Sequence, residues 1–412
     1  MKATSPLWTD LREVFSTRVF SHRLLLLWAL VLVLFLGACS PKPQAAAESE
    51  LQLSVLNVGK ADCMLLFVQD KTYLIDTGWE RTYGLLSEAL RRYNVQKLDG
   101  VFLTHCHKDH EGGLMRLAHT DLPVDAWYAP AIYYDVKAGQ HPMVLAAQER
   151  GAEVTWLSAG DEIAVSPTAS IRVLGPLSVN AENENNNSLI LYVSAPDGTI
   201  LLAADMKNEQ ENELLEAGVV PAANVLKVGH HGDSGASGDW FVRTVMPRLA
   251  VISTSTKEEV DTPARSVIKR LELYGAETIV TQDFTHGVHI TVQNGQASYR
   301  NIDWKLKSHS GEMRMSIDVQ NDLLTIRNST SQDISLNGWT LYSSRGDTSI
   351  ALTEKDVVPA NGVYKIGTHS TGSGASVILS VNRLWHKSKY DQAILYDDAG
   401  LVAAVTDNGM PE

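Results

Sequence analysis

Residues 101–113 read Val-Phe-Leu-Thr-His-Cys-His-Lys-Asp-His-Glu-Gly-Gly, and this stretch decides what kind of fold the chain adopts. Its apolar start leads directly into four side chains that can ligate a metal ion, which are His105, His107, Asp109 and His110. Because side chains alternate along an extended segment, His105 and His107 point the same way. Asp109 and His110 fall at the start of a helix and can face a second ion. The stretch therefore predicts a site for one or two metal ions.

Short apolar runs alternate with helical segments from residue 51 to about residue 304. The runs with strand length and branching are 51–56, 63–68, 72–75, 101–103, 171–174, 189–193, 200–203, 225–228, 249–252 and 278–281. Apolar residues recur at helical spacings in 83–93, 143–151, 209–217 and 264–274. This alternation predicts an α/β fold, in which active residues collect in the loops at strand ends.

More polar side chains stand directly at predicted strand ends. Asp205 ends an apolar strand, and bridging two cations would satisfy both of its oxygens. Asp76 also ends a strand, where a carboxylate that accepts a ring N–H would orient a ligand imidazole. His230 and His231 follow the run 225–228, so one could bind metal or phosphate while the other donates a proton to the leaving oxygen. We expect His230 to bind metal and His231 to be catalytic, although the pattern alone leaves this division open.

Residues 51 to about 300 resemble the metallo-β-lactamase fold superfamily, and within it the hydrolase domain of ComEC-like DNA-uptake proteins. Besides the histidine-rich stretch, the resemblance rests on segments 56–62, 73–78, 185–188, 201–205 and 227–232. It implies an αββα sandwich that holds one or two Zn²⁺ ions. By this resemblance the metal ligands are His105, His107, Asp109, His110, Asp205 and His230, the catalytic residues are Asp109 and His231, and Asp76 and Asn187 support ligands or substrate.

The sequence departs from that family's pattern in several places. Many members of the superfamily have a further histidine before the bridging carboxylate, whereas this chain offers only His119 and His141, neither at a suitable strand end. Ala204 stands where Gly is usual. Where His-Pro is common, the chain has Asp261-Thr262-Pro263, so Asp261 either replaces the imidazole or the ligand is absent. Fewer nitrogen ligands soften the preference for Zn²⁺, and Mn²⁺ is the alternative ion.

The first 38 residues have the order of a lipoprotein signal peptide. Basic residues up to Arg23 precede an uncharged, leucine-rich run, 24–36, and Cys39 follows a Leu-Gly-Ala sequence. The run is shorter than the roughly 20 residues that span a membrane, and it suits the apolar core of a secretory signal. The ending resembles the bacterial lipobox, which implies lipidation of Cys39 and an extracytoplasmic, lipid-anchored place in the cell envelope. An uncleaved signal anchor is the alternative, and residues 39–50 read as a linker.

Beyond a hydrolase domain expected over 51–304, the helical periodicity disappears. Short runs separated by turn sequences lie at 323–326, 340–342, 363–366, 376–379 and 393–396. Residues 312–412 resemble the lamin tail domain, which implies an immunoglobulin-like β-sandwich with Trp339 in its core. Because the motifs are packing and turn residues, we expect a binding or spacing module whose partner is unknown.

Charge limits how such a hydrolase can hold its substrate. The 412 residues include 35 Lys+Arg and 48 Asp+Glu, a net charge of -13 that becomes -15 without residues 1–38. This excludes nucleic-acid binding by a general basic surface, so phosphates would be held by the metals and by residues such as Lys60, Lys108 and Lys227.

We therefore expect a membrane-tethered phosphodiesterase or nuclease (EC 3.1) that uses a metal-activated hydroxide. Its substrate would be a nucleic acid, a nucleotide or an envelope polymer. The alternatives are a β-lactamase-type amide hydrolase and a non-catalytic protein that binds the envelope or nucleic acid.

Overall fold

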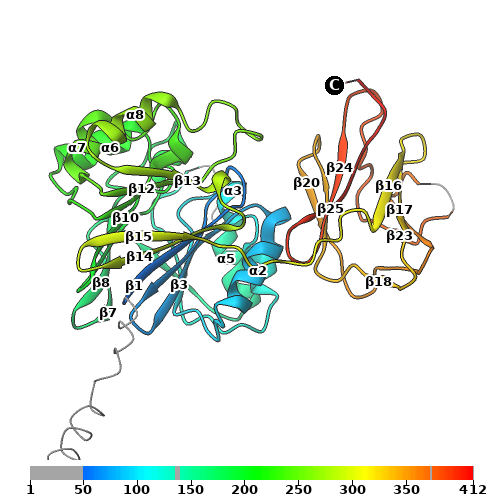
Figure 1. The fold of residues 1–412 in the computed structure, drawn as a ribbon, viewed down its shortest axis with the longest axis horizontal. Coiled ribbons are helices and arrows are strands. Elements are labelled where there is room, and N and C mark those ends of the chain that lie inside the picture. The colour runs from blue at the N-terminus through cyan, green and yellow to red at the C-terminus, as the bar shows by residue number, and fades with distance from the viewer. Residues whose placement is uncertain (1–49, 135–139, 372–373, 412) are drawn as a thin grey trace, which may run out of the picture. The chain divides into compact units, whose positions relative to one another are not determined.

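A computed structural model describes residues 50–134, 140–371 and 374–411 of the protein (Figure 1). The expected signal peptide and Cys39 lie outside the described residues, so the predictions made for them stay predictions. Within the described part of the chain, none of the helices has the length and apolar character needed to cross a membrane.

Two β-sheets form the centre of residues 51–301. The first has the strand order β15 (Gln296–Asn301), β14 (Gly287–Gln293), β1 (Leu51–Leu56), β2 (Cys63–Val68), β3 (Lys71–Thr77), β4 (Gly100–Phe102), β5 (Trp127–Pro130) and β6 (Val154–Leu157). The second has the order β13 (Glu277–Val280), β12 (Leu249–Ile252), β11 (Val225–Lys227), β10 (Gly198–Leu202), β9 (Ile190–Ala195), β8 (Ala169–Gly175) and β7 (Glu162–Ser166). Alternate apolar side chains from both sheets, such as Leu53, Leu191 and Val251, form one buried core between them.

Helices cover the outer faces of the two sheets. The other set of alternate side chains from the first sheet packs against α2 (Tyr83–Arg92), α4 (Leu114–Ala118) and α5 (Pro142–Glu149). The second sheet packs in the same way against α6 (Asn208–Glu216), α7 (Asp239–Val245) and α8 (Arg265–Leu273). The α/β fold and its αββα layering, expected from the sequence, are therefore confirmed.

The expected strands and helices of this part are all present, with ends that differ by one or two residues. The sequence missed β5, β6 and β7, which are only four or five residues long, and the hairpin β14–β15. β15 is polar and mostly exposed, so no apolar run marks it. The short helices α4 and α7 were missed as well, since five and seven residues give too little helical periodicity.

Parallel pairing brings the polar strand ends together. β3, β4, β5 and β6 pair parallel to one another in the first sheet, and β10, β11, β12 and β13 do so in the second. The segments after β4, β10 and β11 carry the histidines and Asp205, and they leave from the carboxyl ends of these strands. One edge of the sandwich therefore collects the residues singled out from the sequence.

The C-terminal part is built from strands alone among its described residues. One sheet has the order β16 (Met313–Asp318), β17 (Leu323–Asn328), β22 (Val363–Gly367) and β23 (Val377–Ile378). Another has the order β20 (Thr348–Ala351), β19 (Thr340–Ser343), β24 (Gln392–Tyr396) and β25 (Val402–Asp407), and β18 (Ile334–Ser335) pairs with β21 (Val357–Val358). Leu324, Leu341, Leu395 and the tryptophans 339 and 385 share one buried core. This arrangement fits the expected immunoglobulin-like sandwich, while the narrower resemblance to a lamin tail domain stays a prediction.

Trp339 is 2% exposed, so its side chain should contribute strongly to the stability of the C-terminal domain. We expect Trp339→Ala to lower the free energy of unfolding of this domain by about 3–5 kcal/mol, because it removes buried apolar surface and leaves a cavity. Calorimetric unfolding would measure the change. Trp240→Ala is the matched control, since Trp240 is 66% exposed and its loss should cost less than about 0.5 kcal/mol. Equal effects of the two substitutions would contradict the core assignment.

Candidate metal centre

The histidine-rich loop follows β4 and turns at once into the short helix α3 (Lys108–Glu111). His107 is extended and precedes the helix, while Asp109 and His110 lie within it and are buried. Asp205 follows β10, and His230 and His231 lie in the one-turn segment η4 (Gly229–Gly232) after β11. The site is thus assembled from both sheets.

These side chains form two groups that share one carboxylate. Asp109, His110, Asp205 and His231 make up the first group, and His105, His107 and Asp205 make up the second. Within each group the candidate ligand atoms lie within 4.8 Å of one another. Asp205, which is 2% exposed, therefore stands where a carboxylate can bridge two cations.

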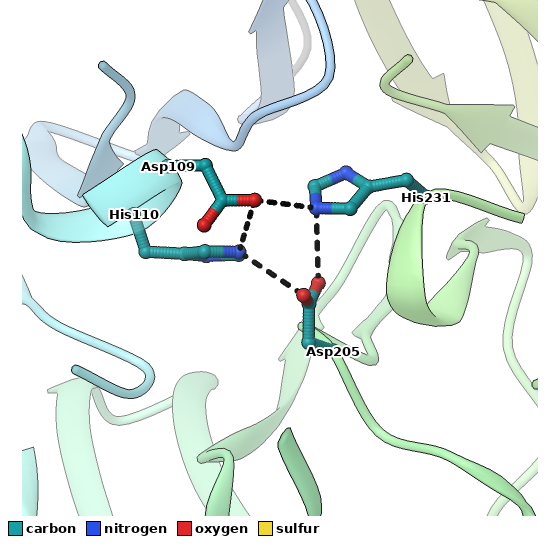
Figure 2. Close-up of side chains that lie close together, drawn as sticks. All are labelled: Asp109, His110, Asp205 and His231. Carbon is teal, nitrogen blue, oxygen red and sulfur yellow. Dashed lines mark ion pairs between the residues drawn. The ribbon is translucent and has the colours of Figure 1, made fainter. Parts of the chain in front are cut away.

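Figure 2 shows the first group converging from α3, the loop after β10 and η4. His231 Nε2 lies 3.3 Å from Asp205 Oδ1 and 3.4 Å from Asp109 Oδ2. His110 Nε2 lies 3.4 Å from Asp205 Oδ2. The four side chains therefore surround a common space.

Unpartnered atoms in this space test whether a metal ion fits the residues. His110 Nε2, His231 Nε2 and Asp205 Oδ1 are buried and make no hydrogen bond. Leaving buried polar atoms unsatisfied is costly, and a cation would satisfy all three at once. Imidazole nitrogens with carboxylate oxygens are donors that Zn²⁺ and Mn²⁺ accept, so the donor set fits such an ion.

The second group is smaller and more open. His105 Nε2 lies 2.9 Å from His107 Nδ1 and 3.8 Å from Asp205 Oδ2. His105 is fully buried, whereas His107 is only half-buried. Both histidines lie within ligand distance of the Asp205 carboxylate, although the backbone bends at His105 and Cys106 rather than running extended.

Asp76 lies where it orients a histidine of the first group. Its Oδ2 accepts the His110 Nδ1 hydrogen at 2.7 Å, and the Thr104 backbone N–H and hydroxyl donate to the same carboxylate at 2.8 and 2.7 Å. Because Nδ1 carries the hydrogen, the lone pair of His110 Nε2 is left to face the ligand group.

Electrostatic coupling within the site shifts the pKa values of its members. Burial lowers the pKa of His231, but the carboxylates of Asp205 and Asp109 outweigh burial and raise it to about 9. Burial raises the pKa of Asp205, but His231 and His110 hold it well below its usual range. Burial also keeps the pKa of His105 well below its usual value, so that imidazole is neutral. In the metal-free protein, protons on the histidines thus balance the negative charge of the carboxylates, as a bound cation would do.

The backbone at the site is strained. Asp76, Ala204, His230 and His231 all have positive φ, at 57°, 43°, 42° and 54°. Residues other than Gly pay a steric cost in this left-handed region. The Gly that is usual in place of Ala204 would avoid that cost, and such strain is typical of functional sites.

The two adjacent histidines lie in the opposite places from those expected for a ligand and its neighbour. His231 is fully buried and belongs to the first ligand group, whereas His230 belongs to neither. His230 Nε2 lies 3.9 Å from Asp205 Oδ2 and 3.2 Å from Asn185 Nδ2. The geometry therefore favours His231 as the ligand and places His230 outside both groups, because successive residues of a tight turn point in different directions.

Two other expected site residues lie away from the ligand groups. Asn187 is buried, and its amide bonds to Asn180 and Glu184, so it supports the fold of its own loop. Asp261 is exposed and belongs to neither group, so the geometry gives it no place among the ligands.

Sequence reasoning missed Asn185 and Ser253. Asn185 lies in the quoted Asn-rich segment, and its Oδ1 is buried without a hydrogen-bond partner beside His230. Ser253 follows β12, and its carbonyl accepts the His231 Nδ1 hydrogen at 2.8 Å. A lone serine at a strand end carries no signal in the sequence that could have identified it.

Comparison with known proteins finds a family match over part of the chain. Residues 56–256 match the sequence profile of the Metallo-beta-lactamase superfamily. ComE operon protein 3 of Bacillus subtilis is 26% identical over 272 residues, which cover 61% of this chain and 33% of that protein. Competence protein ComA of Neisseria gonorrhoeae is 26% identical over 256 residues, which cover 62% of this chain and 34% of that protein. The chain thus matches about a third of each relative's length.

Among solved structures, the metallo-beta-lactamase fold protein YhfI from Bacillus subtilis aligns with a TM-score of 0.37 and 10% identity. The alignment covers 60% of this chain and 99% of YhfI.

Metal binding should release protons from the first group. With a pKa of about 9, His231 is protonated in the metal-free protein at pH 7, and an ion must displace that proton to reach Nε2. We expect the apparent affinity for Zn²⁺ or Mn²⁺ to rise with pH up to about 9 and then to level off. Calorimetric titration in two buffers of different ionisation enthalpy counts the released protons, and His231→Ala should release fewer. An affinity that does not change with pH would contradict this coupling.

Ala204→Gly should stabilise the protein, because Gly adopts the positive φ of this position without steric cost. We expect the free energy of unfolding to rise by about 0.5–1 kcal/mol, measured by urea unfolding. Ala203→Gly is the matched control, since the same change at a neighbouring buried position without positive φ should be destabilising. If both substitutions destabilise equally, the backbone at Ala204 is not strained.

Proposed function

We propose that residues 56–256, which match the sequence profile of the Metallo-beta-lactamase superfamily, belong to a metal-dependent hydrolase that cleaves phosphodiesters, as a phosphodiesterase or nuclease. The observation that carries the proposal is the Asp205 carboxylate shared by two groups of ligands. Ions held there would supply a water nucleophile at neutral pH and positive charge to offset a phosphate. The side chains of the protein would bind the substrate.

His230 and Asn185 are the residues best placed to hold the phosphate. Both are half-buried beside the ligand groups, and neither group includes them. Burial lowers the pKa of His230, which keeps its imidazole neutral at pH 7 and able to donate an N–H to a phosphate oxygen. Lys207 lowers that pKa further, which places its positive charge nearby. Together these groups offer hydrogen bonds and charge to an anionic substrate.

Lysines elsewhere contribute less to substrate binding than the sequence suggested. Lys227 is completely buried, so it cannot contact a phosphate, and the exposed Lys108 side chain forms an ion pair with Asp347. Since the chain is acidic overall, substrate affinity should depend mainly on the bound ions.

Names of the relatives support a substrate related to DNA. Two are a competence protein of Neisseria gonorrhoeae and Recombination protein 2 of Haemophilus influenzae. A nucleic acid is therefore the first substrate to test, followed by nucleotides and envelope polymers.

The proposed setting is the outer side of a bacterial membrane. Lipidation of Cys39, after removal of residues 1–38, would tether the hydrolase through the linker 39–50. The C-terminal β-sandwich would serve either as a binding module, for a partner that the sequence does not identify, or as a spacer.

The proposal is tested by activity of the purified protein on DNA, RNA and bis(p-nitrophenyl) phosphate with Zn²⁺ or Mn²⁺. We expect metal-dependent turnover, and we expect His107→Ala to reduce kcat/KM by roughly 100-fold or more because it removes a ligand. His119→Ala is the matched control, since the His119 side chain is 59% exposed and pairs with Glu149 away from the site.

Three other results would contradict the proposed phosphodiesterase function or favour a different one. Absence of metal-dependent turnover on every phosphodiester would contradict the proposal. Hydrolysis of nitrocefin without phosphodiesterase activity would favour a β-lactamase-type enzyme. Tight DNA binding by a catalytically inert protein would favour a non-catalytic role.

A further inference from the structure

We propose that a buried ion pair between Asp62 and Lys227 positions the first ligand group, holding His231 and Asp109 ready for a metal ion. Asp62 lies in the loop between β1 and β2, and Lys227 ends β11, so the pair joins the two sheets of the sandwich. This inference rests on the metal centre of the proposed function. It assigns a role to two residues that contact neither a substrate nor a metal ion.

The pair is completely enclosed. Both side chains are 0% exposed, and Lys227 Nζ lies 2.8 Å from Asp62 Oδ2. The ammonium also donates a hydrogen bond to the Val228 carbonyl at 3.0 Å. Burying two charges costs several kcal/mol, and a purely packed alternative is often as stable. Stability alone therefore does not account for two buried charges at this position, and we infer a further role for them.

Asp62 contacts both ends of the first ligand group. Its Oδ1 accepts a hydrogen bond from the Ser253 hydroxyl and lies 3.7 Å from His231 Nδ1. Its backbone N–H donates to the Asp109 carbonyl at 3.1 Å. One residue thus holds a ligand from η4 through its side chain and a ligand from α3 through its backbone.

The contacts around His231 determine which of its nitrogens is available. Nδ1 donates to the Ser253 carbonyl at 2.8 Å, and the Asp62 carboxylate adds negative charge beside that N–H. Nδ1 therefore keeps its hydrogen when an ion displaces the Nε2 proton, and the Nε2 lone pair is then directed at the space between Asp109 and Asp205. This is the orientation that a metal ion requires.

Lys227 also keeps Asp62 out of the metal centre. Asp62, Asp76 and His110 bring candidate ligand atoms within 4.8 Å of one another, a third place where a cation could be held. The Lys227 ammonium supplies that positive charge as a permanent part of the chain. Divalent ions are thereby confined to the two groups that share Asp205.

The test compares metal binding with stability in a variant that removes both charges. We would titrate Co²⁺ and Zn²⁺ into the metal-free whole protein and into Asp62→Asn/Lys227→Gln, following the Co²⁺ absorption bands and the unfolding temperature. We expect the variant to bind one ion as the wild type does. The second ion, which is the one held by the first ligand group, should bind 10- to 100-fold more weakly, the order of magnitude seen for residues that orient ligands. The unfolding temperature of the metal-free variant should stay close to that of the wild type.

A surface ion pair gives the matched control. Lys97 Nζ lies 2.6 Å from Asp125 Oδ2, and Lys97→Gln/Asp125→Asn makes the same chemical change away from the ligand groups. It should bind both ions as the wild type does. Ser253→Ala removes the hydroxyl that donates to Asp62 beside His231 and keeps the Asp62–Lys227 pair, so it tests the same idea if the double variant does not fold. We expect it to weaken the second ion selectively as well.

The possible results separate this inference from the proposed function. Two ions bound by the double variant with wild-type affinity would overturn the inference and leave the metal centre intact. Equal weakening of both ions together with a large loss of stability would also overturn it, because the pair would then be only a link between the sheets. A wild-type protein that binds no second ion would contradict the metal centre and the inference together.

Discussion

The Asp205 carboxylate is the group on which the rest of the site depends. It is buried at the end of β10, and both groups of candidate ligands meet at its oxygens. A buried carboxylate is stable only when positive charge surrounds it, and here that charge comes from histidines or from a cation. Candidate ligands from the loops after β4 and β11 surround this one side chain.

Supporting residues hold the ligands in an arrangement that is costly without an ion. Asp76 and Thr104 orient His110, Ser253 orients His231, and several residues keep a left-handed backbone. Unpartnered nitrogens and a strained turn would be selected against in a purely structural core. Their concentration at one place is the physical signature of a site built in advance for its ion and substrate.

Much of this architecture was predictable from local patterns. The layers followed from alternating strands and helices, and the candidate ligands in residues 105–110 followed from their residue types and close spacing after an apolar strand. What local patterns missed were the short strands β5 to β7 and the exposed strand β15, whose stability comes from neighbours rather than from an apolar run. The resemblance also favoured Asn187, and the departure from the family pattern left open whether Asp261 replaces a histidine ligand. Both residues lie outside the two ligand groups because their loops direct them elsewhere.

By itself the sequence determined the fold class, the residue types of a metal centre and the acidic character of the chain, because these depend on composition, periodicity and short-range spacing. Only the tertiary structure decided that His231 rather than His230 joins the ligand group, that Asn185 lies beside His230, and that Lys227 is buried against Asp62. These facts depend on where strands from two sheets end relative to one another. Contacts between residues more than a hundred positions apart, such as Asp62 and Lys227, have no counterpart in a local pattern.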